Sequence, residues 1–172
     1  PVLINITKMK TSALAVLCCV LFFDYKDLRY GVAGESIPDI TIQISSGNNK
    51  NLQDFTDCRR YIYITSWPGK QALIIRELKA FDSIAEIYKD KLLIVGLLDN
   101  GNVKQLNRLI EKYHLLHLKG VIPEGSMQTL SGKGYPYGML FSKYGKLIKK
   151  EMHKGELEVY MKEHVGVERA KF

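Results

Sequence analysis

The middle of the chain is organised around an apolar strand that passes directly into an amphipathic helix. Residues 61–67 (Tyr-Ile-Tyr-Ile-Thr-Ser-Trp) are mostly β-branched or aromatic, Pro68 and Gly69 follow, and residues 72–88 place apolar side chains at spacings of three and four. The first pattern is typical of a buried strand, and the last of a helix that packs on a sheet. Because the Pro-Gly pair favours a turn, the pattern predicts a strand, a turn and a helix of an α/β fold.

Apolar segments on either side of this unit predict the rest of a sheet. Ile40, Ile42 and Ile44 alternate with polar residues, and residues 45–49 have the composition of a turn, so we expect an N-terminal β-hairpin. Residues 92–98 are nearly all apolar, as in a central strand covered on both faces. Further along, the pattern predicts a helix at 103–114, a short edge segment at 120–123, a helical turn at 127–130, strands at 137–141 and 146–152, and a helix at 155–165. The sequence therefore predicts an α/β fold in which three helices pack on a mixed central sheet.

A short apolar segment near the start of the chain predicts export. Lys8 and Lys10 precede residues 13–23, an unbroken apolar run of eleven residues. A bilayer core requires about 20 apolar residues, so the run is short for a stable membrane span and suits the core of a signal peptide. A retained membrane anchor and a buried helix of the domain are the alternatives. The bulky residues before Cys18 argue against a lipoprotein signal.

Length and composition favour a single folded domain. The chain has 172 residues, of which 46% are apolar and 25% are charged. We assign residues 1–33 to a signal peptide or membrane anchor with a short stalk, residues 34–165 to the domain, and residues 166–172 to a tail. The net charge of +7 is distributed among acidic residues, and no basic stripe interleaved with aromatics stands out. We therefore expect no nucleic-acid partner.

The cysteines and histidines do not form a familiar redox or metal motif. The three cysteines are Cys18, Cys19 and Cys58, without a Cys-x-x-Cys or zinc-type pairing. His114 and His117 are three positions apart, a spacing that would share a metal only if the helix continued through both. Since the helix is expected to end near His114, we favour a helix-terminal histidine and predict no metal and no cofactor.

Several weak motifs, taken in order, resemble a known family. They are residues 34–39 (Gly-Glu-Ser-Ile-Pro-Asp), the hairpin followed by 52–55 (Leu-Gln-Asp-Phe), Ser66-Trp67 at the end of a strand, Arg76-Glu77-Leu78 in the next helix, the strand 92–98, Gly134-Tyr135-Pro136, and 143–148 (Lys-Tyr-Gly-Lys-Leu-Ile). Over residues 34–165 the chain resembles the redoxin (AhpC/TSA) branch of the thioredoxin superfamily. It is most similar to the exported or membrane-anchored thiol-disulfide oxidoreductases of the TlpA and ResA type. The resemblance implies a thioredoxin-like fold, a mixed sheet flanked by helices, and a cell-envelope location facing the periplasm.

The chain departs from this family at the residues that carry its chemistry. Active members follow the tryptophan with Cys-x-x-Cys, whereas an ungapped match from Trp67 places Pro68 and Gln71 at those positions. An alignment on the Arg76-Glu77-Leu78 motif places Gln71 and Ile74 there instead. Dithiol exchange requires a thiolate and a second, resolving thiol, and neither alignment supplies one. The resemblance therefore predicts a thioredoxin-like domain with a degenerate active site.

The residues that correspond to the active-site face are the candidate binding surface. They are Ser66, Trp67, Pro68, Gly69, Lys70, Gln71, Tyr135 and Pro136. The family implies a cis peptide bond before Pro136, beside a backbone that can pair with an extended peptide; a purely structural turn is the alternative. Trp67, Tyr135 and Tyr137 are expected to form an aromatic lip that contacts a partner. The expected partner is an envelope protein or an extended peptide.

A redox function through Cys58 is the remaining alternative. Its cationic neighbours Arg59 and Arg60 favour the thiolate. However, Cys58 precedes the strand while the family's site follows it, and eight residues at about 3.3 Å each separate the two ends by roughly 25 Å. We therefore interpret Cys58 as a free thiol. The alternative function is a thiol-disulfide oxidoreductase or antioxidant redoxin that acts with Cys58 or with cysteines of a partner.

Overall fold

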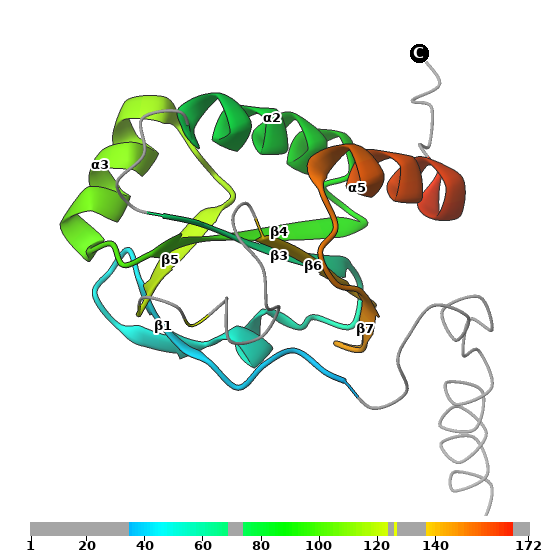
Figure 1. Ribbon diagram of the computed structural model, residues 1–172, viewed down its shortest axis with the longest axis horizontal. Coiled ribbons are helices and arrows are strands. Elements are labelled where there is room, and N and C mark those ends of the chain that lie inside the picture. Colours follow the sequence, from blue (N-terminus) through cyan, green and yellow to red (C-terminus); the bar gives the residue numbers. More distant parts are fainter. Residues whose placement is uncertain (1–34, 69–73, 124–125, 127–136, 167–172) are drawn as a thin grey trace, which may run out of the picture. The chain divides into compact units, whose positions relative to one another are not determined.

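The structure is a computed structural model that describes residues 35–68, 74–123, 126 and 137–166 (Figure 1). The predicted leader or anchor (1–33) and the helical turn predicted at 127–130 lie outside these residues. The elements in chain order are β1 (Thr41–Ile44), β2 (Asn49–Asn51), the 3₁₀ helix η2 (Leu52–Phe55), β3 (Tyr61–Pro68), α2 (Ile74–Ile87), β4 (Leu92–Asp99), α3 (Val103–Tyr113), β5 (Leu118–Ile122), β6 (Tyr137–Phe141), β7 (Leu147–Lys149), α5 (Lys154–Tyr160) and the π-helical turn η3 (Met161–Val165).

The described strands form one mixed sheet in the order β2-β1-β5-β4-β3-β6-β7. Strand β3 pairs with β4 in parallel over its whole length, from Tyr61 opposite Leu92 to Pro68 opposite Asp99. Strand β5 continues the parallel part, whereas β6 and β7 follow β3 in antiparallel register. The predicted α/β fold with a mixed central sheet and an N-terminal hairpin is confirmed.

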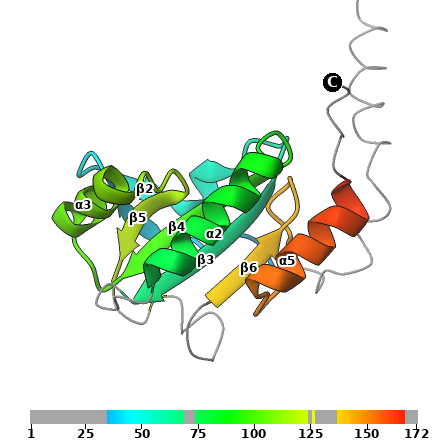
Figure 2. The same ribbon diagram turned by 90° about the horizontal axis from the view of Figure 1, so that it is seen from above.

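The three described α-helices lie on one face of the sheet. Figure 2 shows α2 running over β3 and β4, α3 beside β5, and α5 beside β6. Side chains from all three helices, including Phe81, Leu106 and Leu157, enter the hydrophobic core on this face. The opposite face is covered by the segment around Ile37, by Ile42 of β1 and by Leu52 of η2, which join a second core. Both faces of the central strands are therefore buried, as their continuous apolar sequences predict.

The prediction of an edge strand near residues 120–123 is wrong. Strand β5 lies inside the sheet, because β1 pairs with it in antiparallel register on the side away from β4. Gly120 permits this close approach, since a Cβ atom there would lie 2.7 Å from Cδ1 of Ile42. This long-range pairing depends on a hairpin that is about 80 positions away in the sequence, and no local pattern encodes it.

The segment before β1 protects the other edge of the sheet. Ser36 forms an isolated bridge with Lys146, and the amide of Leu147 donates a hydrogen bond to the carbonyl of Glu35. The carboxylate of Glu35 also pairs with Lys150 at 2.7 Å. These contacts cover the backbone groups of a strand edge that would otherwise pair with another chain. In the part of the chain that the structure describes, no helix has the length and apolar character needed to cross a bilayer.

Candidate functional site

The carboxyl end of β3 is buried in the protein interior. Ser66 is fully buried, the Trp67 side chain is 1% exposed, and Pro68 is half-buried. The end of β4 lies beside it, where Asp99 is paired in register with Pro68 and is also buried. Gly69, Lys70, Gln71, Tyr135 and Pro136, the other members of the candidate surface, lie outside the described residues. The described residues of this face are therefore part of the protein interior rather than of an exposed binding surface.

The indole of Trp67 packs against two rings beneath the helices. Its centroid lies 5.5 Å from that of Phe81 on α2 and 5.9 Å from that of His117, both in edge-to-face geometry. These separations are in the range in which aromatic pairs stabilise each other. The expected aromatic lip is wrong for Trp67, because a side chain that is 1% exposed does not reach a partner. Tyr135 and the side chain of Tyr137, the other two members of the expected lip, lie outside the described part of the structure.

His117 is a buried polar side chain held by an acidic residue from α2. Its Nδ1 lies 2.5 Å from Oδ1 of Asp82, and its backbone amide donates to the same carboxylate at 3.4 Å. The imidazole is 0% exposed, whereas the Asp82 side chain is 25% exposed. Burial lowers the pKa of His117 below its ordinary value, and the hydrogen bond and charge of Asp82 oppose this shift. The pair ties α2 to the start of β5 beneath Trp67.

The predicted role of the histidine pair is partly confirmed. His114 caps the end of α3 in the left-handed conformation, with φ of 54°, so the helix ends where the sequence predicts. The Nδ1 of His117 faces Asp82, and His117 lies three positions beyond the capping His114 rather than on the helix. Within the described ranges, no group of three or more His, Cys, Asp or Glu side chains is placed to hold a metal ion.

A buried hydroxyl connects β3 to the start of α5. The Tyr63 Oη donates a hydrogen bond of 2.6 Å to the carbonyl of Met152. Gly138 on β6 makes room for it, because a Cβ atom at that position would lie 1.9 Å from the Tyr63 hydroxyl and 2.3 Å from the Met152 carbonyl. Burial raises the pKa of Tyr63, so this group remains a protonated donor.

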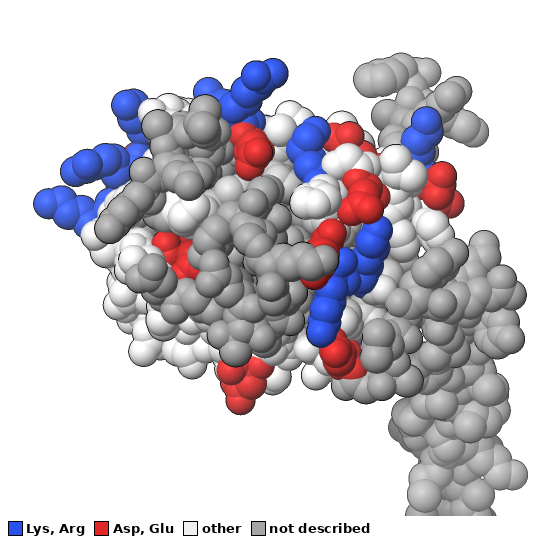
Figure 3. Space-filling model, in the orientation of Figure 1, with Lys and Arg blue, Asp and Glu red and all other residues white. Residues whose placement is uncertain are grey.

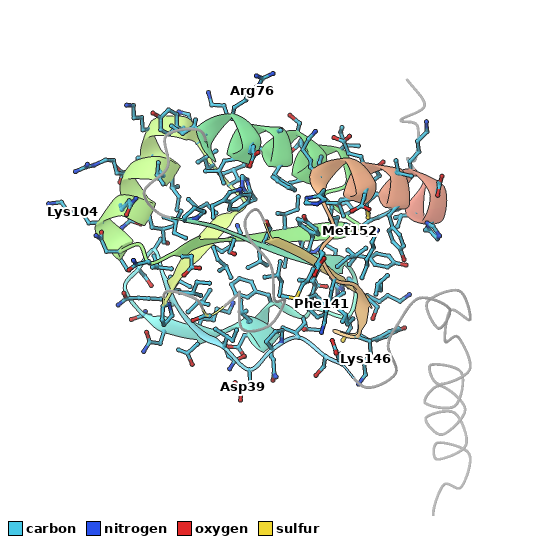
Figure 4. All side chains as sticks on the ribbon, in the orientation of Figure 1. Asp39, Arg76, Lys104, Phe141, Lys146 and Met152 are labelled. Carbon is cyan, nitrogen blue, oxygen red and sulfur yellow. The ribbon has the colours of Figure 1, made fainter. Side chains whose placement is uncertain are left out.

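A cleft of about 720 Å³ opens beside this hydrogen bond, between the first turns of α2 and the start of α5. Its apolar walls come from Tyr63, Ala80, Phe81 and Met152, and its polar walls from Arg76, Glu77, His153, Lys154 and Gly155. Figure 4 shows Met152 between the sheet and the start of α5, and Arg76 at the outer side of α2. This volume is in the range of ligand-binding clefts, which combine apolar walls with a few polar groups.

Cys58 lies at the opposite end of β3. It is exposed, belongs to the loop before the strand, and has a left-handed backbone with φ of 56°. Asp57 stabilises this loop by accepting hydrogen bonds from the amides of Arg59 and Arg60 at 2.9 and 3.0 Å. The eight residues of β3 separate the loop from Pro68, which corresponds to roughly 25 Å of extended strand. Cys58 is thus a free, exposed thiol at the amino end of β3.

Comparisons with solved structures identify the fold. A thiol:disulfide interchange protein from a Bacteroides species superposes with a TM-score of 0.60 and 18% identity over 82% of this chain and 95% of that chain. The thioredoxin domain of a thiol-disulfide oxidoreductase from Bacteroides vulgatus gives 0.57 and 19% over 75% and 94%. A secreted disulfide oxidoreductase from Mycobacterium tuberculosis gives 0.52 and 14% over 70% and 92%. The chain has a thioredoxin-like fold. No protein-family model matches the sequence, and no curated protein does.

Within the thioredoxin-like domain, the cleft is a candidate site that the sequence does not predict. In the sequence, Arg76 and Glu77 are part of a motif of the family resemblance, and His153 belongs to no motif. They meet because β7 returns the chain to the start of β6, where the amide of Met152 donates to the carbonyl of Gly138 at 2.8 Å. The sequence does contain two residues that mark one wall of the cleft, Gly138 and Tyr63, and both lie on strands that the sequence predicts. Their pairing, however, depends on the sheet order.

The cleft of the thioredoxin-like domain combines apolar walls with charged and polar groups. The cleft offers aromatic and aliphatic walls, a guanidinium, a carboxylate, an ammonium and an imidazole. These groups are able to pack against a ligand and to hydrogen-bond with it, and none of them is a thiol. Among the described residues the one cysteine is Cys58, at the far end of β3.

Proposed function

We propose that this chain is a thioredoxin-like domain of the cell envelope that binds a partner without thiol chemistry. The proposal places it near the exported redoxins of the TlpA type, as a member whose turn after β3 has lost both cysteines. The observation that carries it is the position of Cys58 at the amino end of β3, about 25 Å from the carboxyl end. Residues 59–172 contain no other cysteine.

The fold supports retention of a binding surface. At the carboxyl end of β3, Trp67 packs against His117, and the Nδ1 of His117 lies against the carboxylate of Asp82. This packed cluster lies beneath the carboxyl end of β3, from which the turn of the candidate surface begins. The adjacent cleft provides the described part of the surface. We propose an envelope protein or an extended peptide as the partner.

The envelope location is part of the proposal. It rests on the cationic and apolar pattern of residues 8–23, which suits a signal peptide or an anchor. One similar structure is that of an exposed lipoprotein thioredoxin from Streptococcus pneumoniae, with a TM-score of 0.55 and 20% identity. N-terminal sequencing and fractionation of the protein from cells test this location. An intact leader in the cytosol would contradict it.

The binding role is tested by filling the cleft. Ala80 is half-buried in its wall, so Ala80→Trp should occupy the space that a partner uses. Partner capture from detergent-solubilised envelope should fall strongly. Val159→Trp is the matched control, because Val159 is 52% exposed on α5 and does not line the cleft. Equal capture by the two variants would exclude the cleft as the binding surface.

A redox function remains the second candidate, since Cys58 is exposed beside Arg59 and Arg60. A domain of this kind would act through Cys58 or through cysteines of the partner. Turnover in an insulin-reduction or peroxide-consumption assay that Cys58→Ser abolishes would favour this candidate. Turnover equal to background in both proteins supports the binding role.

A further inference from the structure

The outer face of α3 carries three basic side chains in line. Lys104, Arg108 and Lys112 are all exposed. Their spacing of four places them on one side of the helix. Figure 4 shows Lys104 pointing away from the body of the domain.

Helix α2 extends the row into a continuous surface. Arg76 and Lys79 are exposed on its first turns. The Nζ of Lys79 lies 5.7 Å from the ring centroid of Tyr113, and the Nζ of Lys112 lies 5.2 Å from the same centroid. The two helices therefore meet at Tyr113. We define the basic face as Arg76, Lys79, Lys104, Arg108 and Lys112; Figure 3 shows Lys and Arg side chains along this margin of the domain.

The charges of the basic face are not neutralised within the described part of the chain. Ion pairs there involve Arg60, Lys89, Lys149, Lys150 and Lys154, and none involves a residue of the basic face. Helices α2 and α3 also carry four acidic residues, of which Asp82 pairs with His117 and Glu86 with Lys89. The other two, Glu77 and Glu111, are exposed beside the five residues of the basic face.

The composition of the basic face distinguishes between kinds of partner. Protein interfaces depend on buried apolar and aromatic anchors at their centre. The large apolar residues that are exposed in the described structure are Ile87, Leu116, Tyr144 and Val159. None falls within residues 76–79 or 104–112. Long, flexible basic side chains without apolar anchors instead fit a surface of diffuse negative charge, such as a bilayer of anionic phospholipid.

We propose that the basic face docks the domain on anionic phospholipid head groups. The interaction is electrostatic, so it orients the domain on a bilayer and weakens with salt. Of the five residues of the basic face, Arg76 alone also lines the cleft, so docking on lipid can hold where the proposed function fails. The same charges would also attract a nucleic acid, and the experiment includes that outcome.

The test is lysine footprinting of the full chain with vesicles, read by mass spectrometry of each lysine. Vesicles of phosphatidylcholine alone are compared with vesicles of equal parts phosphatidylcholine and phosphatidylglycerol. The anionic vesicles should protect Lys79, Lys104 and Lys112 several-fold, and high salt should remove the protection. Lys149 and Lys150, which are paired with Glu156 and Glu35, should label equally in both vesicles.

Charge variants identify the surface. In the triple variant Lys104→Gln/Arg108→Gln/Lys112→Gln, the concentration of anionic lipid that half-protects Lys79 should rise roughly a hundredfold. The matched control Lys146→Gln/Lys149→Gln/Lys150→Gln removes the same charge and should leave Lys79 protection unchanged. Circular dichroism verifies that both variants are folded.

Three results would overturn the proposal. If Lys79, Lys104 and Lys112 are labelled equally with neutral and with anionic vesicles, the basic face does not contact the anionic bilayer. An equal loss of protection in the control variant would show that only net charge matters. Stronger protection by duplex DNA than by anionic vesicles, at equal phosphate concentration, would assign the basic face to nucleic acid.

Discussion

The imidazole of His117 lies 2.5 Å from the carboxylate of Asp82, although the two residues are 35 positions apart in the chain. This contact joins α2 to the start of β5 and places His117 edge-on against Trp67. We expect Asp82→Ala to lower the free energy of unfolding by about 1–3 kcal/mol, because it leaves a buried polar group without its partner. Urea denaturation of the two proteins measures the difference. A loss near zero would mean that the pair contributes nothing.

The buried state of His117 also predicts the pH dependence of stability. Its pKa is lower in the folded protein than the value of about 6.5 in an unfolded chain, because burial disfavours the charged ring. The unfolded state therefore binds more protons below pH about 6.5, and stability falls as pH drops from there toward the folded pKa. His117→Gln should flatten this decline, measured by urea denaturation at several pH values. His153→Gln alters an exposed histidine and should retain it.

Gly138 should be intolerant of any side chain. A Cβ atom there would lie 1.9 Å from the Tyr63 hydroxyl, so Gly138→Ala forces this buried side chain or the strand to move. We expect a loss of about 1–3 kcal/mol of stability, which is typical of an overpacked core. Gly155→Ala is the matched control, since nothing lies within 4 Å of its Cβ position. The control should be neutral or stabilising by roughly 0.5–1 kcal/mol. Similar effects at both glycines would be inconsistent with the described packing.

The sequence predicts most of the fold and little of the site, and particular residues show why. The continuous apolar run of β4 and the spacing of Leu78, Phe81 and Ile84 in α2 are local signals, and both elements form where they predict. The position of β5 in the sheet depends on β1, which is remote in sequence, and the edge prediction is wrong for that reason. A local sequence pattern predicts whether a segment is a helix or a strand, but it does not predict which strands pair with it in the sheet.

Burial of polar and aromatic side chains was the harder part to predict. Trp67 ends a strand beside a turn, where exposure is a reasonable expectation, yet Phe81 and His117 cover it. Asp82 looks like a solvent-facing residue of an amphipathic helix, and its pairing with His117 becomes visible only once α2 and β5 are side by side. The basic face has the same origin, since it combines residues from two helices.

Restoring cysteines tests whether the turn after β3 retains the family's geometry. The two alignments predict that either Pro68→Cys/Gln71→Cys or Gln71→Cys/Ile74→Cys places two thiols within bonding distance. One pair should form a disulfide on mild oxidation, visible as a loss of free thiols by mass spectrometry. The background is Cys58→Ser, which removes the exposed thiol. If both pairs stay reduced under conditions that oxidise thioredoxins, the turn does not preserve that geometry.

The most direct test of the account is dithiol turnover by the purified full chain in an insulin-reduction assay. The account predicts a rate equal to the uncatalysed background, unchanged by Cys58→Ser, because no thiol lies at the carboxyl end of β3 among the described residues. Turnover well above background in the wild-type chain, lost in Cys58→Ser, would contradict it.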